Sequence, residues 1–569
     1  MLQFYIVVLL SIIAIASPLT LPRRPTPSRI FDTENYKDAA SLSKKLASHK
    51  PSTPSDVKTV AVIGGGLSGL SCAKYLSDAG HTPVIYEARS ILGGKVSAWA
   101  DPSGDYIETG LHIFFGAYPN MMNLFTELSL HSRLQWTPHR MTFALPSTPG
   151  GFTSFNFPGP SIPSPFNMAY AILTNTEMLS LLDKLKMLPG LLPMYVRGQS
   201  FIDEQDELTV DEFMEKYGMP PSIKVELFNA MGKALDFIDS SKLSMGVILT
   251  AMNRFINEAD GSQTAFIDGP QTERLCGPIK EYIEERGGKV NTGMPVDEIV
   301  TDDEGVITCL KMRDGSEVVA DHYVSAMPVD VFKRLMPEKW AGNSFFKGVE
   351  ELKGVPVINV MVWFDGRLET SGEGLCFSRS EVLSVYADMS KNCAEYENSE
   401  GSVLSLVFAP CDEQTGSSIN WMKEPDSQII DATLGELCRL FPGELGSDAR
   451  FPRTESEGPH GVRVVKSAVV RTPRSVYAAV PGMNKFRPTQ STPIPNFTLA
   501  GDWSSQKYLG SMEGAVYAGK LAAEAIVEGR RGEGEQGGGG KKPGGNRGET
   551  PIAFGGGQVG VGTEFKNHA

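Results

Sequence analysis

The sequence has few cysteines and histidines, and neither residue is clustered. Seven cysteines and eight histidines are scattered over 569 residues, without a C-x-x-C pair or a Cys/His group at metal-ligand spacing. We therefore expect no metal site and no disulfide framework. The odd number of cysteines favours a compartment in which thiols stay reduced.

Long apolar runs and an excess of positive charge are also missing. The formal net charge is −14 with no sustained basic face, which excludes nucleic acid as a favoured partner. No stretch reaches the roughly 18 consecutive apolar residues of a membrane-spanning helix. The apolar fraction of 41% over 569 residues is nevertheless enough for two or more hydrophobic cores.

Both ends of the chain have the composition of segments outside the folded part. Residues 1–16 hold an apolar run that ends in Ala14-Ile15-Ala16, which is typical of a signal peptide. Residues 17–56 are rich in Pro, Ser, Thr, Lys and Arg and resemble a transit or linker segment. Together they predict import into a plastid, with secretion as the alternative. Residues 529–569 predict a disordered Gly-rich tail, solubilising rather than RNA-binding.

A strand, a glycine-rich turn and a helix follow one another from Val60 onwards. The apolar run 60–63 predicts a buried parallel strand, and Gly64, Gly66 and Gly69 then stand at G-x-G-x-x-G spacing. In such a turn the start of the helix, including Ser68, presents backbone N–H groups to a diphosphate. A second strand ends at Glu87, where a ribose needs an acceptor, unless Glu87 is an ordinary strand-end charge.

The residues after Glu87 favour a flavin over a nicotinamide. A second glycine pair with flanking cations, in the run Ala88-Arg89-Ser-Ile-Leu-Gly93-Gly94-Lys95, can close over the same diphosphate from the other side. This E-A-R-x-x-x-G-G-K run resembles the flavoproteins that include amine oxidases and carotenoid desaturases, and the resemblance implies bound FAD.

The loop 108–120 makes the resemblance more specific. Its sequence E-T-G-L-H-I-F-F-G-A-Y-P-N, with Gln135-Trp136 and Phe155-Asn-Phe-Pro158 further on, resembles plant-type 15-cis-phytoene desaturases. The resemblance implies that His112, Ile113 and Tyr118 lie against the flavin. Taken alone, a histidine such as His112 is more often structural than functional.

Residues 161–265 predict helices that are rich in Leu and Met. We expect one of them to lie in a membrane surface, with Lys184 and Lys186 at headgroup level; a core helix of the substrate domain is the alternative. Arg254, in a segment that resembles the family's N-R-F, needs a carboxylate, a backbone carbonyl or a quinone oxygen as partner, and a structural ion pair is equally compatible.

The last motif closes the predicted site. The run Phe497-Thr-Leu-Ala-Gly501-Asp502 predicts a strand that ends in glycine and aspartate, and the apolar positions after Ser511 predict a capped helix that starts at Met512. Asp502 can accept from ribityl hydroxyls, and the helix start near Met512 can stabilise charge on the flavin. We expect Gly510, where the family often has Ala, to be a further substrate or quinone contact. Val296, by resemblance, lies beside the adenine.

The predicted fold class is α/β, with a discontinuous Rossmann-like FAD-binding domain, an inserted mixed-sheet substrate domain and a helical membrane-associating region. The predicted segments are 1–16 signal peptide, 17–56 transit-like linker, 57–160, 266–330 and 481–528 FAD-binding domain, 161–265 helical region, 331–480 substrate domain and 529–569 tail.

The resemblance implies FAD-dependent desaturation of 15-cis-phytoene to ζ-carotene via phytofluene, with plastoquinone as the electron acceptor and peripheral attachment to a plastid membrane. Because a hydrocarbon offers no group to a base or nucleophile, we expect hydride transfer to the flavin and assign no side-chain acid or base. A ζ-carotene desaturase, another amine-oxidase-like oxidase and a non-enzymatic FAD-stabilised scaffold are the alternatives, and a homo-oligomer is compatible with all of them.

Overall fold

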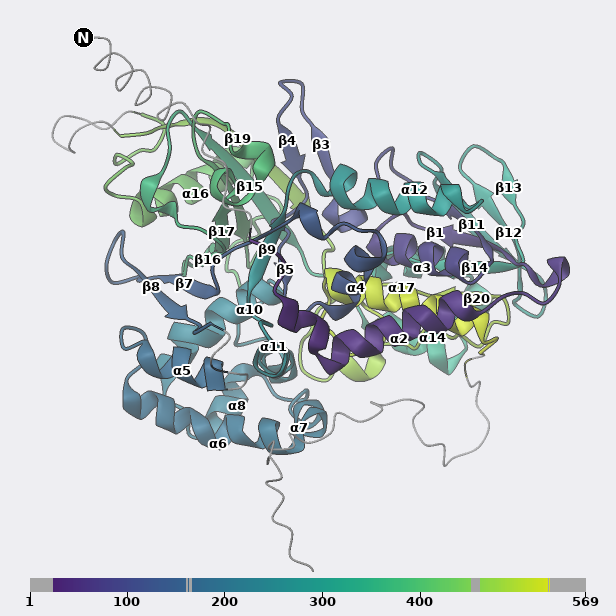
Figure 1. The fold of residues 1–569 in the computed structure, drawn as a ribbon, viewed down its shortest axis with the longest axis horizontal. Coiled ribbons are helices and arrows are strands. Elements are labelled where there is room, and N and C mark those ends of the chain that lie inside the picture. Colours follow the sequence, from purple (N-terminus) through teal and green to yellow (C-terminus); the bar gives the residue numbers. More distant parts are fainter. Residues whose placement is uncertain (1–23, 160–161, 163–165, 452–460, 531, 533–569) are drawn as a thin grey trace, which may run out of the picture.

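The computed structural model of the protein describes residues 24–159, 162, 166–451, 461–530 and 532 (Figure 1). The predicted signal peptide, the first part of the transit-like segment and nearly all of the predicted tail lie outside the described residues.

A parallel sheet of five strands forms the nucleotide-binding half of the molecule. The strand order is β10-β2-β1-β14-β20, and all neighbours run parallel. The strands are β1 (Thr59–Ile63), β2 (Thr82–Tyr86), β10 (Lys289–Asn291), β14 (His322–Ser325) and β20 (Phe497–Leu499). The strands β14 and β20 are buried along their whole length, as is usual for a parallel sheet that is covered on both faces. Three separate chain segments build this sheet, which confirms the predicted discontinuous domain.

Helices pack on this sheet and on one another. Helix α3 (Leu67–Asp78) follows β1 and packs against α17 (Met512–Val527), where the Ser71 hydroxyl donates to the carbonyl of Val516 at 2.8 Å. Helices α4 (Pro119–Glu127) and α12 (Gly277–Glu285) complete the layer.

The segment before β1 is folded, although its composition predicts a transit-like linker. Helix α2 (Glu34–Ser48) lies along α4 and α17 (Figure 1) and buries Ala39, Ser43 and Leu46. The composition of residues 17–56 did not reveal this helix, because only a few of its positions are apolar. Those positions pack against α4 and α17, which are distant in the sequence.

A second, seven-stranded sheet has the order β19-β15-β18-β17-β16-β7-β8. The pair β16–β7 is parallel and all others are antiparallel, which confirms a mixed sheet. Its strands are β7 (Arg140–Ala144), β8 (Phe152–Asn156), β15 (Val357–Phe364), β16 (Cys376–Phe377), β17 (Leu383–Asp388), β18 (Val403–Phe408) and β19 (Val464–Thr472). Helix α16 (Asp426–Leu440) packs on one face. The strands β7 and β8 thus belong to the seven-stranded sheet, although they precede the predicted boundary at residue 160.

Helices fill residues 166–257, as the sequence predicts, and most of them gather at the lower left of Figure 1. They are α5 (Phe166–Thr174), α6 (Leu181–Arg197), α7 (Gln199–Glu204), α8 (Val210–Lys216), α9 (Pro221–Ile223), α10 (Asn229–Leu235) and α11 (Met245–Asn257). Helix α6 continues through Pro189 and Pro193, although proline ordinarily interrupts a helix. Burial of its inner face against neighbouring helices offsets the backbone hydrogen bonds that the two prolines remove.

Within the described ranges, each helix is too short or too polar to reach across a bilayer. The two lysines of α6 differ in exposure: Lys186 is exposed, whereas Lys184 is buried and donates to the carbonyls of Leu173 and Asn175. The expectation that Lys184 lies at headgroup level is therefore wrong, because its ammonium group caps the end of α5.

Shorter elements connect the two halves. The strands β3 (Ala98–Ala100) and β4 (Tyr106–Glu108) form a two-stranded sheet. Two further sheets have three strands each: β5 (Phe114–Phe115), β9 (Thr264–Ile267) and β6 (Leu134–Trp136) in one, and β11 (Val296–Thr301), β12 (Ile307–Met312) and β13 (Glu317–Val318) in the other. The remaining helices are α13 (Val329–Leu335), α14 (Ser344–Glu351) and α15 (Met389–Asn392).

Candidate functional site

A large cavity of about 1040 Å³ extends from the glycine turn after β1 to the seven-stranded sheet. It is lined by parts of all three segments of the nucleotide-binding domain, by α10 and α11, and by strands of the second sheet. The predicted site residues that line it are Gly64, Gly66, Ser68, Glu87, Ala88, Arg89, Gly94, Lys95, His112, Ile113, Tyr118, Arg254, Val296, Asp502, Gly510 and Met512. Gly69 does not line the cavity.

The glycine turn is shaped by backbone constraints. Gly64 has a φ of +112°, a conformation that only glycine adopts without strain. A Cβ atom on Gly69 would lie 2.0 Å from the carbonyl oxygen of Gly64, so this glycine lets α3 start directly beside the turn. Gly66 faces the cavity and precedes α3, whose first N–H groups have no acceptor within the helix.

The second glycine pair lies directly against the first turn. The Gly93 N–H donates to the Gly65 carbonyl at 2.9 Å, and a Cβ atom on Gly66 would lie 3.8 Å from the carbonyl oxygen of Gly93. The two turns thus form a narrow backbone cradle with the start of α3 at its side. The Arg89 guanidinium supports this cradle, because it donates to the hydroxyl of Ser97 at 2.8 Å.

Glu87 braces the same cradle from the end of β2. Its carboxylate accepts the N–H groups of Gly65 and Arg89 at 2.7 and 2.8 Å, and a carboxylate retains further lone pairs for a ribose hydroxyl. The Met294 N–H donates to the Glu87 carbonyl at 2.8 Å, which holds the start of β11, with Val296, next to Ala88.

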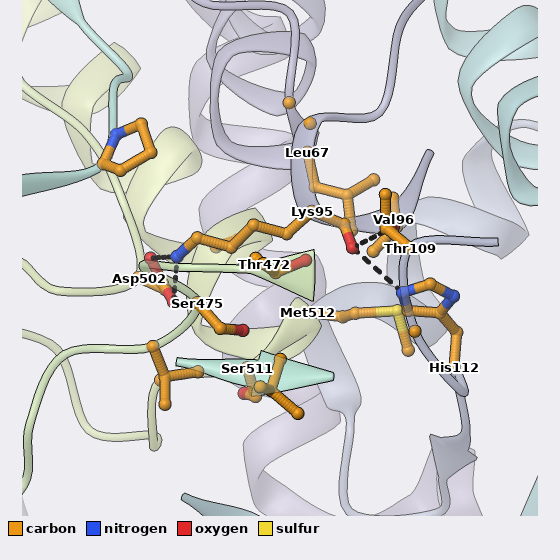
Figure 2. A pocket seen from close by; sticks show the side chains of 18 of the residues that line it. Leu67, Lys95, Val96, Thr109, His112, Thr472, Ser475, Asp502, Ser511 and Met512 are labelled. Carbon is orange, nitrogen blue, oxygen red and sulfur yellow. Dashed lines mark hydrogen bonds and ion pairs between the residues drawn. The ribbon is translucent and has the colours of Figure 1, made fainter. Parts of the chain in front are cut away.

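The helix α17 begins at the cavity as its sequence predicts. The Ser511 hydroxyl caps it by accepting the Gly514 N–H at 3.1 Å, which confirms the expected N-cap. Figure 2 shows Lys95 reaching across the cavity to Asp502, at 3.0 and 3.1 Å from the two carboxylate oxygens. In the same view, the side chains of Met512 and His112 lie on the side away from Asp502.

His112 is held by two acceptors. Its Nε2 lies 3.0 Å from the Lys95 carbonyl oxygen (Figure 2), and its Nδ1 lies 3.2 Å from the Glu108 carboxylate. Because both ring nitrogens face acceptors, the imidazole presents no lone pair to the cavity. This geometry suits a structural or packing role better than that of a general base.

Arg254 meets a backbone carbonyl, one of the partners expected for it. It is buried at the end of α11, donates to the Lys507 carbonyl at 3.3 Å and lies with its guanidinium carbon 5.4 Å from the centre of the Tyr508 ring. Gly510 lies nearby, and a Cβ atom there would approach the Val476 Cβ to 3.2 Å. Burial raises the pKa of Tyr118, which keeps its phenol neutral.

Sequence reasoning missed the apolar walls that the second sheet contributes. They include Met141 of β7, Phe377 of β16, Val385 of β17 and Val407 of β18. The sequence predicts a mixed-sheet domain over residues 331–480, but the face that each strand turns to the cavity depends on its pairing.

Glu513 was also missed. Its buried carboxylate accepts the N–H groups of Asn120 and Met121 and the Asn120 amide at 2.8–3.0 Å, and so ties the start of α17 to the start of α4. Burial raises its pKa to about 7. An acidic residue in the first turn of a helix was the signal that could have found it.

Comparison with known proteins places the chain in a family. The model of the family "Flavin containing amine oxidoreductase" matches residues 67–527. The 15-cis-phytoene desaturase of Capsicum annuum, named chloroplastic/chromoplastic, is 49% identical over 505 residues, which cover 89% of this chain and 83% of that protein. The 15-cis-phytoene desaturase of Synechococcus elongatus is 48% identical, covering 82% and 95%. The zeta-carotene desaturase of Synechocystis is 35% identical, covering 82% and 97%.

Solved structures agree on the fold. An oxidoreductase from Methanosarcina mazei superposes with a TM-score of 0.59 at 17% identity, over 83% of this chain and 100% of that one.

Proposed function

Because the chain belongs to the flavin-containing amine oxidoreductases and to the 15-cis-phytoene desaturases among them, we propose that it binds FAD in this cavity and desaturates 15-cis-phytoene to ζ-carotene via phytofluene. The observation that carries the proposal is one cavity that joins a backbone cradle for a diphosphate to a chamber with apolar walls.

The residues of the cradle fit FAD. The two glycine turns and the start of α3 offer N–H donors to a diphosphate, and Glu87 lies where an adenosine ribose would follow. Asp502 and the start of α17 lie at the opposite side, where ribityl hydroxyls and the flavin ring would lie. When bound, the flavin supplies the acceptor for the hydride that a desaturation releases.

The rest of the cavity fits a hydrocarbon. Ile113, Phe115 and Met141 line it together with Phe377, Val385 and Val407. Such walls bind a polyene by apolar contact alone and exclude water from the reacting carbons. The titratable groups near the cradle are engaged: Glu87 braces backbone N–H groups, Asp502 pairs with Lys95, and both nitrogens of His112 face acceptors. We therefore assign to the side chains binding and orientation, and no role as catalytic acid or base.

Arg254 is the residue we propose for the electron acceptor, a quinone such as plastoquinone. Its guanidinium lies in the wall of the same cavity, beside Tyr508 and near Gly510. A guanidinium in an apolar wall is a strong donor for a quinone carbonyl oxygen. Substrate and acceptor would then occupy the chamber in turn.

We further propose peripheral attachment to a plastid membrane through α5 and α6. These adjoining helices expose a row of large apolar side chains: Phe166, Tyr170, Leu173, Leu181, Leu182, Leu185, Leu188, Leu192 and Val196. A patch of this kind buries favourably among lipid acyl chains, which are also the solvent of phytoene. A plastid location agrees with the chloroplastic names of the plant relatives.

The decisive experiment is product analysis with purified holoprotein, phytoene in liposomes and a plastoquinone analogue. We expect phytofluene and ζ-carotene to accumulate. Conversion of added ζ-carotene instead would identify a ζ-carotene desaturase, and oxygen consumption with an amine would identify an oxidase. A protein that holds its flavin but converts none of these substrates would support the non-enzymatic scaffold.

A further inference from the structure

The segment ahead of the first strand is an integral part of the nucleotide-binding half. Besides its buried apolar residues, α2 accepts the Lys520 ammonium at the Ala39 carbonyl (3.1 Å) and the Asn123 amide at the Ser43 hydroxyl (2.7 Å). Lys45 pairs with Glu524 of α17 at 2.7 Å. An import segment that ended at residue 56 would remove all of these contacts.

The beginning of this segment holds the turn that follows α11. The Arg29 guanidinium donates to both carboxylate oxygens of Asp260, with Nε 3.0 Å from Oδ2, and the Asn35 amide donates to the carboxylate of Glu258. Both acids are nearly inaccessible to solvent, so these partners replace the water that their charges would otherwise need. Asp260 also has a φ of +55°, a strained conformation that persists only where neighbours hold it.

This turn supports two walls of the cavity. Its carbonyls at Gly261 and Gln263 accept the N–H groups of Ala117 and Gly116, both at 3.0 Å, and thereby hold the loop that carries Tyr118. Its first residue, Glu258, lies one helical turn after Arg254 and donates its N–H to the Arg254 carbonyl at 3.1 Å.

Asn35 also reaches the opposite side of Arg254. Its side-chain oxygen accepts the ammonium group of Lys507, and the Lys507 carbonyl in turn accepts the Arg254 guanidinium. Asn35 therefore joins the turn after α11, which directly follows the helix that carries Arg254, to the loop before α17, whose Lys507 carbonyl accepts the Arg254 guanidinium.

We propose that Arg29 and Asn35 are positioning residues of the cavity: they hold the turn 258–263 and Lys507 so that Arg254 and the loop 115–118 keep their places. The inference deepens the proposed function, since its effect on turnover rests on Arg254 facing the electron acceptor. It assigns a role in the chemistry to a segment whose composition resembles a discarded leader.

The first test is independent of activity. Hydrogen exchange is measured by mass spectrometry on the full-length holoprotein, in wild type, Arg29→Ala, Asn35→Ala and the control Lys37→Ala, whose exposed ammonium group pairs only locally with Glu34. We expect the amides of Gly116 and Ala117 to exchange at least tenfold faster in the first two variants, and at the wild-type rate in the control. Unchanged exchange in both Arg29→Ala and Asn35→Ala would overturn the inference.

The second test measures the acceptor. With decylplastoquinone as the probe, we expect its KM to rise severalfold in Arg29→Ala, while anaerobic bleaching of the flavin by phytoene stays within twofold of wild type. Arg29→Lys, which keeps the charge but loses the planar fork, should restore part of the effect. If exchange accelerates and the KM stays unchanged although Arg254→Ala raises it, the proposed link between the segment and Arg254 is wrong.

The outcome for Arg254→Ala separates this inference from the proposed function. An unchanged quinone KM in Arg254→Ala would refute the acceptor role of Arg254, whereas the exchange experiment would still decide whether Arg29 and Asn35 hold the loop. The double variant Arg29→Ala/Asp260→Asn guards against general destabilisation, because Asn tolerates the positive φ and the charge pair is already lost. Because Asp260→Asn also removes the buried charge that Arg29→Ala leaves unpaired, the effect of the double variant should be no larger than that of Arg29→Ala alone, and a larger effect would refute action through this pair.

Discussion

Replacement of Gly66 by valine should weaken flavin binding and leave the fold intact. Gly66 has an extended backbone (φ −77°, ψ 177°) that accepts a β-branched residue, and a Cβ atom there has no neighbour closer than 3.8 Å. The same atom would occupy the space between the two glycine turns, where a diphosphate must lie. Gly69→Ala is different, since its Cβ would collide with the Gly64 carbonyl at 2.0 Å and damage the fold itself.

The expected size of the effect follows from the cost of overpacking. Forcing extra methyl groups into an occupied space costs about 1–3 kcal/mol, which corresponds to a flavin affinity about 5- to 150-fold weaker. The assay is the ratio of flavin to protein absorbance after gel filtration, together with the melting temperature of the flavin-free protein. The matched control is Gly435→Val, on the exposed side of α16 with nothing within 4 Å. A Gly66→Val protein with the wild-type flavin ratio would refute the placement of the diphosphate.

Three further predictions concern the membrane, the reaction and pH. Leu185→Glu should weaken sedimentation with liposomes at least severalfold, whereas Val465→Glu, equally exposed on β19, should not; equal losses in both would remove the role of α6. His112→Ala and Arg254→Ala should slow turnover with the quinone but keep anaerobic flavin bleaching by phytoene, so complete loss of bleaching in a flavin-loaded variant would reveal an essential acid or base. Burial lowers the pKa of His322 to about 3. Between pH 6.5 and about 3, His322 therefore binds a proton in the unfolded chain but stays neutral in the folded chain. Stability should therefore fall between pH 6.5 and 4, and a melting-temperature profile that is no flatter in His322→Asn would contradict this assignment.

The sequence by itself determined the parts of the site whose geometry is local. The turn at Gly64, Gly66 and Gly69, the carboxylate at Glu87 and the helix capped by Ser511 each depend on residues within about 25 positions, so spacing and capping rules predict them. The loop 108–120 was placed at the flavin by its resemblance to the desaturases, and His112, Ile113 and Tyr118 do line the cavity.

Only the tertiary structure decided what depends on pairing between distant segments. The strands β7 and β8 join the seven-stranded sheet through the parallel pair β7–β16. The apolar wall of the cavity could therefore not be assigned from the alternation of apolar and polar residues within one strand. Lys184 caps a helix end instead of facing lipid, because the carbonyls of Leu173 and Asn175 come from a neighbouring helix and its turn. By composition alone, the segment that contains Arg29 and α2 resembles a polar leader. The fold brings Glu258 and Asp260, which lie more than 220 residues away in the sequence, to Asn35 and Arg29. Buried charges need partners wherever the chain can bring them, and which partners meet is a property of the fold rather than of any local pattern.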